Sequence, residues 1–303
     1  MPPAFSPSSR TWKAAWLLTL AVLAAGTAWP VMKYALADAT PVWFAAARAG
    51  LSAIAAFILL AVLGKLRWPT RRDLPIIVSV GVLQLCAFFA FSHLGLNLLP
   101  AGRSAVLAYT TTLWVVPLAG PLLGEWPRGG QMAGVALGLG GVAVLLAPAT
   151  ADWSGASAAL GHVYLLAAAL AWALAILSSR GHRWHLTPLQ VLPWQMLLAT
   201  VLLAPLALLA EPDGGIALTA RALAPLAYIG LFAGLVITWA ATSAASMLPA
   251  AASSLGFLAT PVIGAAISAM WLGEKLTSDF VAGGVLVLAG AALAIVAAGR
   301  SRR

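Results

Sequence analysis

Long apolar runs alternate with short polar segments along the whole chain. The runs are bounded by charged residues, prolines and glycines, and each is long enough for a helix to cross the roughly 30 Å hydrocarbon layer of a membrane. Ten such spans are predicted, at approximately 12–36, 41–64, 74–96, 100–123, 130–147, 159–179, 188–210, 222–245, 250–272 and 278–298. The pattern therefore predicts an all-α integral membrane protein with ten transmembrane helices.

The composition agrees with this pattern and narrows the class further. Hydrophobic residues make up 62% of the 303 residues and charged residues 8%, against about 45–50% and about 25% in ordinary globular chains. Ten helices of roughly 20 residues use about two thirds of the chain, so no separate soluble domain fits. The first apolar stretch is too long for the core of a secretory signal and is followed by similar stretches.

The few reactive or charged residues exclude several functions. The 17 basic residues form no long run with interleaved aromatics, so we expect no nucleic-acid partner. The single cysteine, Cys86, has no partner for a disulfide or a metal site, and no metal or other cofactor is expected. No Walker A sequence is present. No span contains a paired base and nucleophile or a deep carboxylate, so we do not expect an enzyme.

The basic residues predict the orientation in the membrane. If the N-terminus is cytoplasmic, the inner segments carry twelve of them: Arg10, Lys13, Lys65, Arg67, Arg71, Arg72, Arg128, Arg180, Arg183, Arg300, Arg302 and Arg303. The outer segments then carry only four: Lys33, Arg103, Arg221 and Lys275. Because cytoplasmic loops are enriched in Lys and Arg, we expect a multi-pass protein of the cell inner (plasma) membrane with both termini cytoplasmic.

The chain also repeats itself. A shift of 149 residues aligns Pro100 with Pro249, the Leu-Gly-Glu of 123–125 with that of 272–274, and Gly134 with Gly283. A shift of 147 aligns Lys33 with Arg180, Thr40-Pro41 with Thr187-Pro188, and Arg48 with Gln195. We place one five-helix repeat at 1–148, a second at 157–298 and a basic cytoplasmic tail at 299–303. Because five spans per repeat is an odd number, the second repeat is inverted relative to the first, as in many secondary transporters.

These residues carry a resemblance to a known family. The ten spans, the doubled five-helix unit and the two Leu-Gly-Glu turns before glycine-rich helices resemble the EamA-type drug/metabolite transporter superfamily. In that family the first helix of each half ends in a basic residue, here Lys33 and Arg180, and a proline precedes the second glutamate by 13 residues, here Pro261. A looser overall similarity to the YddG-like amino-acid exporters of the same superfamily implies amino acids as substrates.

Arg48 and His93 are the titratable side chains of greatest interest within the spans. Arg48 lies seven residues after Pro41, where it can hold a substrate carboxylate. The alternative, which is favoured, is an arginine that reaches the headgroups or the carbonyls of a neighbouring helix. His93 can couple transport to protons, although a lone histidine near an interface more often only satisfies hydrogen bonds.

Uncharged polar and aromatic residues at mid-depth predict the path of a solute. The cavity candidates besides Arg48 and His93 are Gln84, Phe88, Tyr109, Trp172, Trp239, Ser253 and Phe257. Rings beside hydroxyl and amide groups suit a small amphipathic solute, although each residue taken alone is as readily explained by helix packing. Pro117 and Pro121 are the candidates for a gating bend, whereas Gly130, Gly134 and Gly138 indicate close helix packing.

The leading hypothesis is a secondary transporter that exports small metabolites, most plausibly amino acids, including aromatic or neutral ones. It would work by alternating access between the inverted halves, without ATP. The alternatives are a passive channel-like facilitator and a drug exporter of the same superfamily. The expected partners are a small-molecule substrate and the lipid bilayer, with a monomer as the working oligomeric state.

Overall fold

The computed structural model describes residues 9–146, 155–180, 185–245, 247–248 and 250–300. Within them, ten segments are long and apolar enough to cross a membrane, and their ends lie within a few residues of the predicted ones. The last three residues of the predicted basic tail, with Arg183, fall outside the described residues. The all-α architecture and the ten spans are confirmed.

Six spans are single helices and four are composite. The single helices are α1 (Ser9–Ala35), α2 (Pro41–Val62), α7 (Gly129–Leu146), α8 (Ala156–Arg180), α9 (Pro188–Ala210) and α14 (Ser278–Arg300). The third span joins α3 (Leu74–Ser79), the π-helix η1 (Val80–Ala87) and α4 (Phe88–Leu98), and the fourth joins α5 (Ala101–Ala108) and α6 (Thr111–Leu123). The eighth joins α10 (Ala220–Ala227), the π-helix η3 (Tyr228–Ala233) and α11 (Gly234–Ala245), and the ninth joins α12 (Ala250–Phe257) and α13 (Ala259–Leu272).

The two halves share their irregularities as well as their helices. A π-helix interrupts the third span of each half-chain repeat, and the next span breaks at Tyr109–Thr110 in the first half and at Leu258 in the second. Each Leu-Gly-Glu turn follows such a broken span, and its glycine ends the helix in the left-handed region, with φ 73° at Gly124 and 70° at Gly273. Glycine adopts this conformation without the steric cost that a Cβ imposes.

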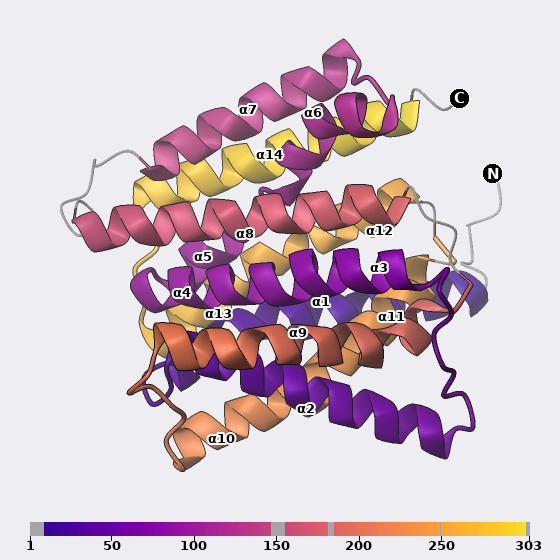
Figure 1. The fold of residues 1–303 in the computed structure, drawn as a ribbon. Helices are drawn as coiled ribbons and strands as arrows, with labels where there is room; N and C mark the ends of the chain where they lie inside the picture. The colour runs from indigo at the N-terminus through magenta and orange to yellow at the C-terminus, as the bar shows by residue number, and fades with distance from the viewer. Residues whose placement is uncertain (1–8, 147–154, 181–184, 246, 249, 301–303) are drawn as a thin grey trace.

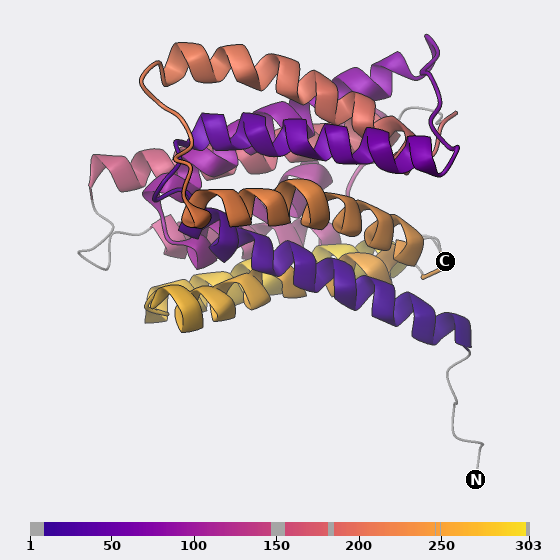
Figure 2. The same ribbon diagram turned by 90° about the horizontal axis from the view of Figure 1, so that it is seen from below.

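Helices at equivalent positions in the two repeats pack as pairs. α2 lies beside α9, and α7 lies along α14 (Figures 1 and 2). A Cβ at Gly134 would come within 2.6 Å of the backbone of α14 at Gly290 and Ala294, and one at Gly141 would meet Gly283 and Val287. The close packing predicted from the glycine spacing is thus confirmed, because only glycine lets these backbones approach so closely.

The helix starts at the two Thr-Pro pairs differ. Thr187 Oγ1 accepts a hydrogen bond from the backbone N–H of Gln190, completing a capping box. Thr40 also occupies the N-cap position, but its side chain makes no capping bond. Instead the Glu211 carboxylate, from the second half, accepts from the N–H groups of Val42 and Trp43 at 3.1–3.3 Å. The first half therefore depends on the second to complete this helix end.

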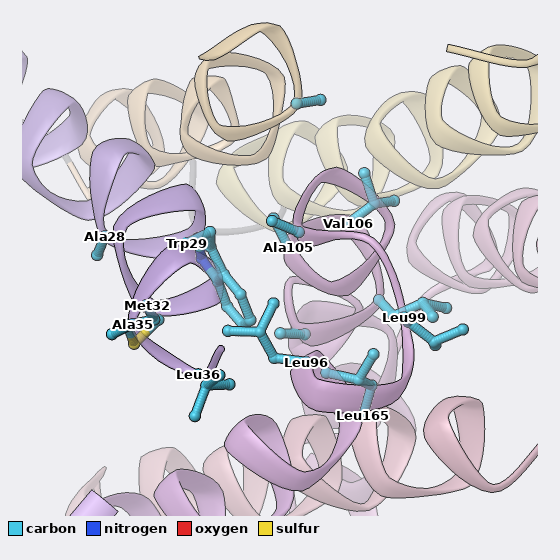
Figure 3. Close-up of a cluster of buried hydrophobic side chains, with 14 of the residues drawn as sticks. Ala28, Trp29, Met32, Ala35, Leu36, Leu96, Leu99, Ala105, Val106 and Leu165 are labelled. Carbon is cyan, nitrogen blue, oxygen red and sulfur yellow. The ribbon is translucent and has the colours of Figure 1, made fainter. Parts of the chain in front are cut away.

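The two ends of the bundle are distinguishable. α1 begins and α14 ends at one end, on the right in Figure 1, which we call the terminal end; the opposite is the far end. Towards the far end, α1, α4, α5 and α8 close around a buried apolar cluster that includes Trp29, Met32, Leu96 and Leu165 (Figure 3). Burial of these side chains holds the helices of the two halves together at that end.

Candidate functional site

Three aromatic side chains predicted to line a solute path lie together. The Trp172 ring on α8 is 5.1 Å from the Phe88 ring at the start of α4 and 5.7 Å from the Tyr109 ring at the break between α5 and α6, measured between centroids. Tyr109 meets Trp172 edge to face at 81°, a favourable geometry for two aromatic rings. The Tyr109 hydroxyl faces Thr260 on α13. Rings of the first half and Trp172 of the second thus meet where the fourth span is broken.

Arg48 lies next to this group and points into the bundle. Its guanidinium carbon is 4.0 Å from the centroid of the Phe89 ring, and its Nη1 lies 3.0 Å from the sulfur of Met32 and 3.5 Å from His93 Nε2. Its Nε is buried and has no hydrogen-bond partner among the described residues. No described carboxylate forms an ion pair with Arg48. The side chain contacts the interior and does not extend to the membrane surface.

His93 is fully buried on the other side of the same guanidinium. Its Nδ1 lies 2.5 Å from the carbonyl oxygen of Phe89, one helical turn earlier, and its ring centroid is 5.7 Å from that of Phe44, with the planes tilted by 42°. Both ring nitrogens therefore have neighbours, at Phe89 and Arg48. The sequence analysis gave two alternatives for His93, proton coupling and a purely hydrogen-bonding role, and this environment is the one expected for the second.

Phe89 connects the arginine to the aromatic group, and the sequence analysis did not single it out. Its ring lies under Arg48 and 6.2 Å from that of Phe88. The signal was available, because Phe89 precedes His93 by one turn and therefore shares its helix face. We call Arg48, Phe89, Phe88, Trp172 and Tyr109, which form one continuous series, the arginine–aromatic site.

The remaining candidates are placed elsewhere or only near this site. Gln84 is half-buried in η1, one turn before Phe88. Trp239 on α11 is 47% exposed, and Phe257 packs with a separate cluster formed by α1 and α11. Ser253 is buried on α12. The structure thus gathers five side chains into one series but does not join Trp239 or Phe257 to it through the described ring contacts.

The two candidate gating prolines do not mark the break in the fourth span. Pro117 and Pro121 both lie inside the continuous helix α6, and the chain leaves helical geometry earlier, at Tyr109–Thr110. Arg103, expected near the outer surface with Lys33, is buried in an ion pair with Asp279 at 2.8 Å and donates to the carbonyl of Leu145. Arg103 therefore links helices to one another, and its positive charge is paired with Asp279.

The described residues contain no group of three or more His, Cys, Asp and Glu side chains that could hold a metal ion. What they do contain is an apolar bundle of two repeats, with Arg48 and aromatic rings between the helices.

The sequence profile of the EamA-like transporter family matches residues 12–147 and 159–296. The chain belongs to the EamA-like transporter family. The two matched segments correspond to the two repeated halves, each of which holds five of the ten candidate spans.

Similar transporters and one solved structure cover almost the whole chain. A probable terminal-alkyne amino-acid exporter of Streptantibioticus cattleyicolor is 28% identical over 93% of each chain. The uncharacterized transporter YvbV of Bacillus subtilis is also 28% identical, over 93% of this chain and 90% of that one. A crystal structure described only as that of a protein aligns with TM-score 0.67 at 22% identity, covering 96% of this chain and 98% of that chain. That structure supports the fold alone.

Proposed function

We propose that this transporter exports amino acids through the inner membrane, with its termini cytoplasmic, by alternating access between its two halves. Family membership supplies small-molecule transport, and the relative named as a probable terminal-alkyne amino-acid exporter directs attention to amino acids. The asymmetry of basic residues supports the orientation.

The observation that carries the substrate class is the half-buried side chain of Arg48, whose Nε is buried. A cation inside a membrane protein is costly unless an anion or hydrogen-bond acceptors compensate it, and the described residues provide no carboxylate for it. Its Nε is left without a partner. A substrate carboxylate would supply both the charge and the acceptor, because guanidinium and carboxylate groups match in geometry.

The neighbouring rings supply the rest of the site. Phe88, Trp172 and Tyr109 extend from Arg48 through Phe89 and present apolar faces with one hydroxyl. An amino acid whose carboxylate is held at Arg48 would place its side chain against these rings. This arrangement suits neutral and aromatic amino acids better than small organic cations, which Arg48 would repel.

The test is uptake by purified protein in liposomes, without ATP, using a panel of radiolabelled neutral, aromatic, acidic and basic amino acids. We expect exchange of neutral or aromatic amino acids above empty liposomes. A parallel panel of organic cations tests the drug-exporter alternative. If the whole amino-acid panel gives no uptake while an organic cation is exchanged, the amino-acid proposal is wrong.

A further inference from the structure

The Leu-Gly-Glu turn of the second half clamps a helix of the first half at the far end. The backbone N–H groups of Ala101 and Gly102, the first residues of α5, donate to Glu274 Oε1 and Oε2 at 2.5 and 3.0 Å. These N–H groups have no acceptor within their own helix, and a carboxylate there also meets the positive end of the helix dipole. Glu274 therefore ties the turn after α13 to the start of α5.

Lys33 makes the complementary contact beside it. Its Nζ donates to the carbonyl oxygens of Leu96 and Asn97 at 2.7 and 3.1 Å, at the C-terminal end of α4. Lys33 and Glu274 line the same shallow basin at the far end, about 510 Å³ in volume. An anion thus holds the start of α5 and a cation holds the end of α4, on either side of the turn that joins them. We call Lys33 and Glu274 the far-end latch.

The internal repeat places an equivalent pair at the terminal end. The 149-residue shift relates Glu274 to Glu125 and the start of α5 to the start of α12, at residues 250–251. The 147-residue shift relates Lys33 to Arg180. The turn that carries Glu125 has the same left-handed glycine as its counterpart. The terminal end is therefore built with the same parts.

Those parts are not engaged in the same way. Glu125 and Arg180 face each other at 3.7 Å, and their side chains are 54% and 49% exposed. In the described part of the chain, α5 packs against α13, whereas the equivalent pair, α12 and α6, shares no comparable packing. The two halves thus have equivalent residues but different contacts. The carboxylate at the far end caps a helix, and the one at the terminal end is half-exposed.

We propose that Glu274 and Glu125 are alternating latches of the transport cycle. In the state seen here, Glu274 caps α5 and closes the far end. When that end opens, Glu125 caps α12 at the N–H groups of residues 250 and 251 and closes the terminal end. The two carboxylates position helices and do not contact substrate. The role in transport rests on the proposed function, but the latch itself can be tested without any substrate.

Glu211 provides a matched control. Its carboxylate also accepts N–H groups at the start of a first-half helix at the far end, those of Val42 and Trp43. The residue that the 147-residue shift relates to Glu211 is Gly64, which cannot form a corresponding cap. Glu211 lies in the α2–α9 pair and has no alternating partner, so its neutralisation should not change which end is closed.

The experiment measures how fast a thiol reagent reaches the far end in purified protein. Cys86 is replaced by serine, and single cysteines are introduced by Leu99→Cys or Leu36→Cys, two buried positions that line the far-end basin. Glu274→Gln should raise the labelling rate about tenfold, since it replaces charge-assisted hydrogen bonds by neutral ones. Glu125→Gln should leave the rate unchanged or lower it, and Glu211→Gln should leave it unchanged. Only variants that elute as monodisperse protein are compared.

An unchanged labelling rate in Glu274→Gln, or an equal increase in Glu211→Gln, would overturn the latch. In the liposome assay, Glu274→Gln and Glu125→Gln should both slow exchange, because each end must close once per cycle, whereas Glu211→Gln should not. If labelling responds as expected but no amino acid is exchanged, the latch stands and only the proposed substrate is wrong.

Discussion

At the scale of single residues, Arg48 shows how a side chain's role depends on what surrounds it. The sequence analysis set a carboxylate-binding role against an arginine that reaches the headgroups or the carbonyls of a neighbouring helix, and favoured the second. In the structure the guanidinium lies over the Phe89 ring and beside His93. An arginine so placed is directed into the bundle and away from the lipid headgroups, and its carboxylate-binding role is the one that we propose.

Arg48→Gln separates substrate binding from a structural role. If Arg48 holds the substrate carboxylate, the variant should raise the KM for amino-acid exchange about tenfold or more, since a charge-assisted hydrogen bond is lost. Its melting temperature should not fall, because the variant removes a buried charge that no described carboxylate compensates. Arg48→Lys should retain part of the affinity. A variant with unchanged KM and a lower melting temperature would instead indicate that Arg48 only supports the fold.

At the scale of elements, the irregularities of the helices lie where the sequence did not predict them. A continuous third and fourth span was predicted, with a bend at Pro117 or Pro121, but the π-helix and the break lie elsewhere. A Cβ on Gly81 in η1 would lie 3.0–3.4 Å from Leu198 and the carbonyl of Gln195, and Gly230 in η3 faces Leu51 and the carbonyl of Arg48. η1 thus packs closely on α9 and η3 on α2, and the repeat relates these two contacts to each other.

The glycines of α7 give a test of element packing with an internal control. Gly134→Ala should lower the melting temperature, because the added methyl group meets the α14 backbone at 2.6 Å and overpacking costs about 1–3 kcal/mol. Gly140→Ala, on the open face of the same helix with nothing within 4 Å, should raise it slightly, since alanine is the better helix former by about 1 kcal/mol. Thermal unfolding in one detergent checks both. Equal effects would contradict the packing explanation.

At the scale of the whole molecule, the two repeats form one transport unit with two ends. At the far end, Glu274, which follows α13 in the second half, caps α5 of the first half. If the two repeats exchange roles during transport, the far end and the terminal end are not closed at the same time. This arrangement favours a carrier over an open pore.

A carrier and a channel differ in their flux. With a preloaded neutral amino acid inside liposomes, we expect uptake of labelled amino acid to saturate with external concentration and to be accelerated by the internal pool, because one site is exposed to one side at a time. Empty liposomes and protein-free preloaded liposomes are the controls. Flux that rises linearly with concentration and ignores the internal pool would indicate a channel-like facilitator.

Much of the fold could be predicted because its signals are local. The apolar runs located ten spans, and the two Leu-Gly-Glu turns and the Thr-Pro pairs revealed the repeat. The glycine spacing indicated close helix packing, and the structure shows that the partner of α7 is α14. The site was predicted less completely. Phe88, Tyr109 and Trp172 were named and do lie together. Phe89 was missed: its helix face could be read from His93, but its contact with Arg48 depends on how α4 packs on α2.

The sequence by itself therefore determined the class, the number of spans and the doubled plan of this protein, because the length and hydropathy of each helix are set by the membrane and do not depend on its neighbours. Only the tertiary structure decided that Arg48 turns inward, that the helices break at Tyr109 and Leu258, and that Glu274 caps a helix while Glu125 does not. These features depend on contacts between residues that lie 16 to 173 positions apart in the chain. Two turns with the same Leu-Gly-Glu sequence therefore occupy different environments. In this conformation Glu274 caps a helix at the far end, whereas Glu125 at the terminal end faces Arg180.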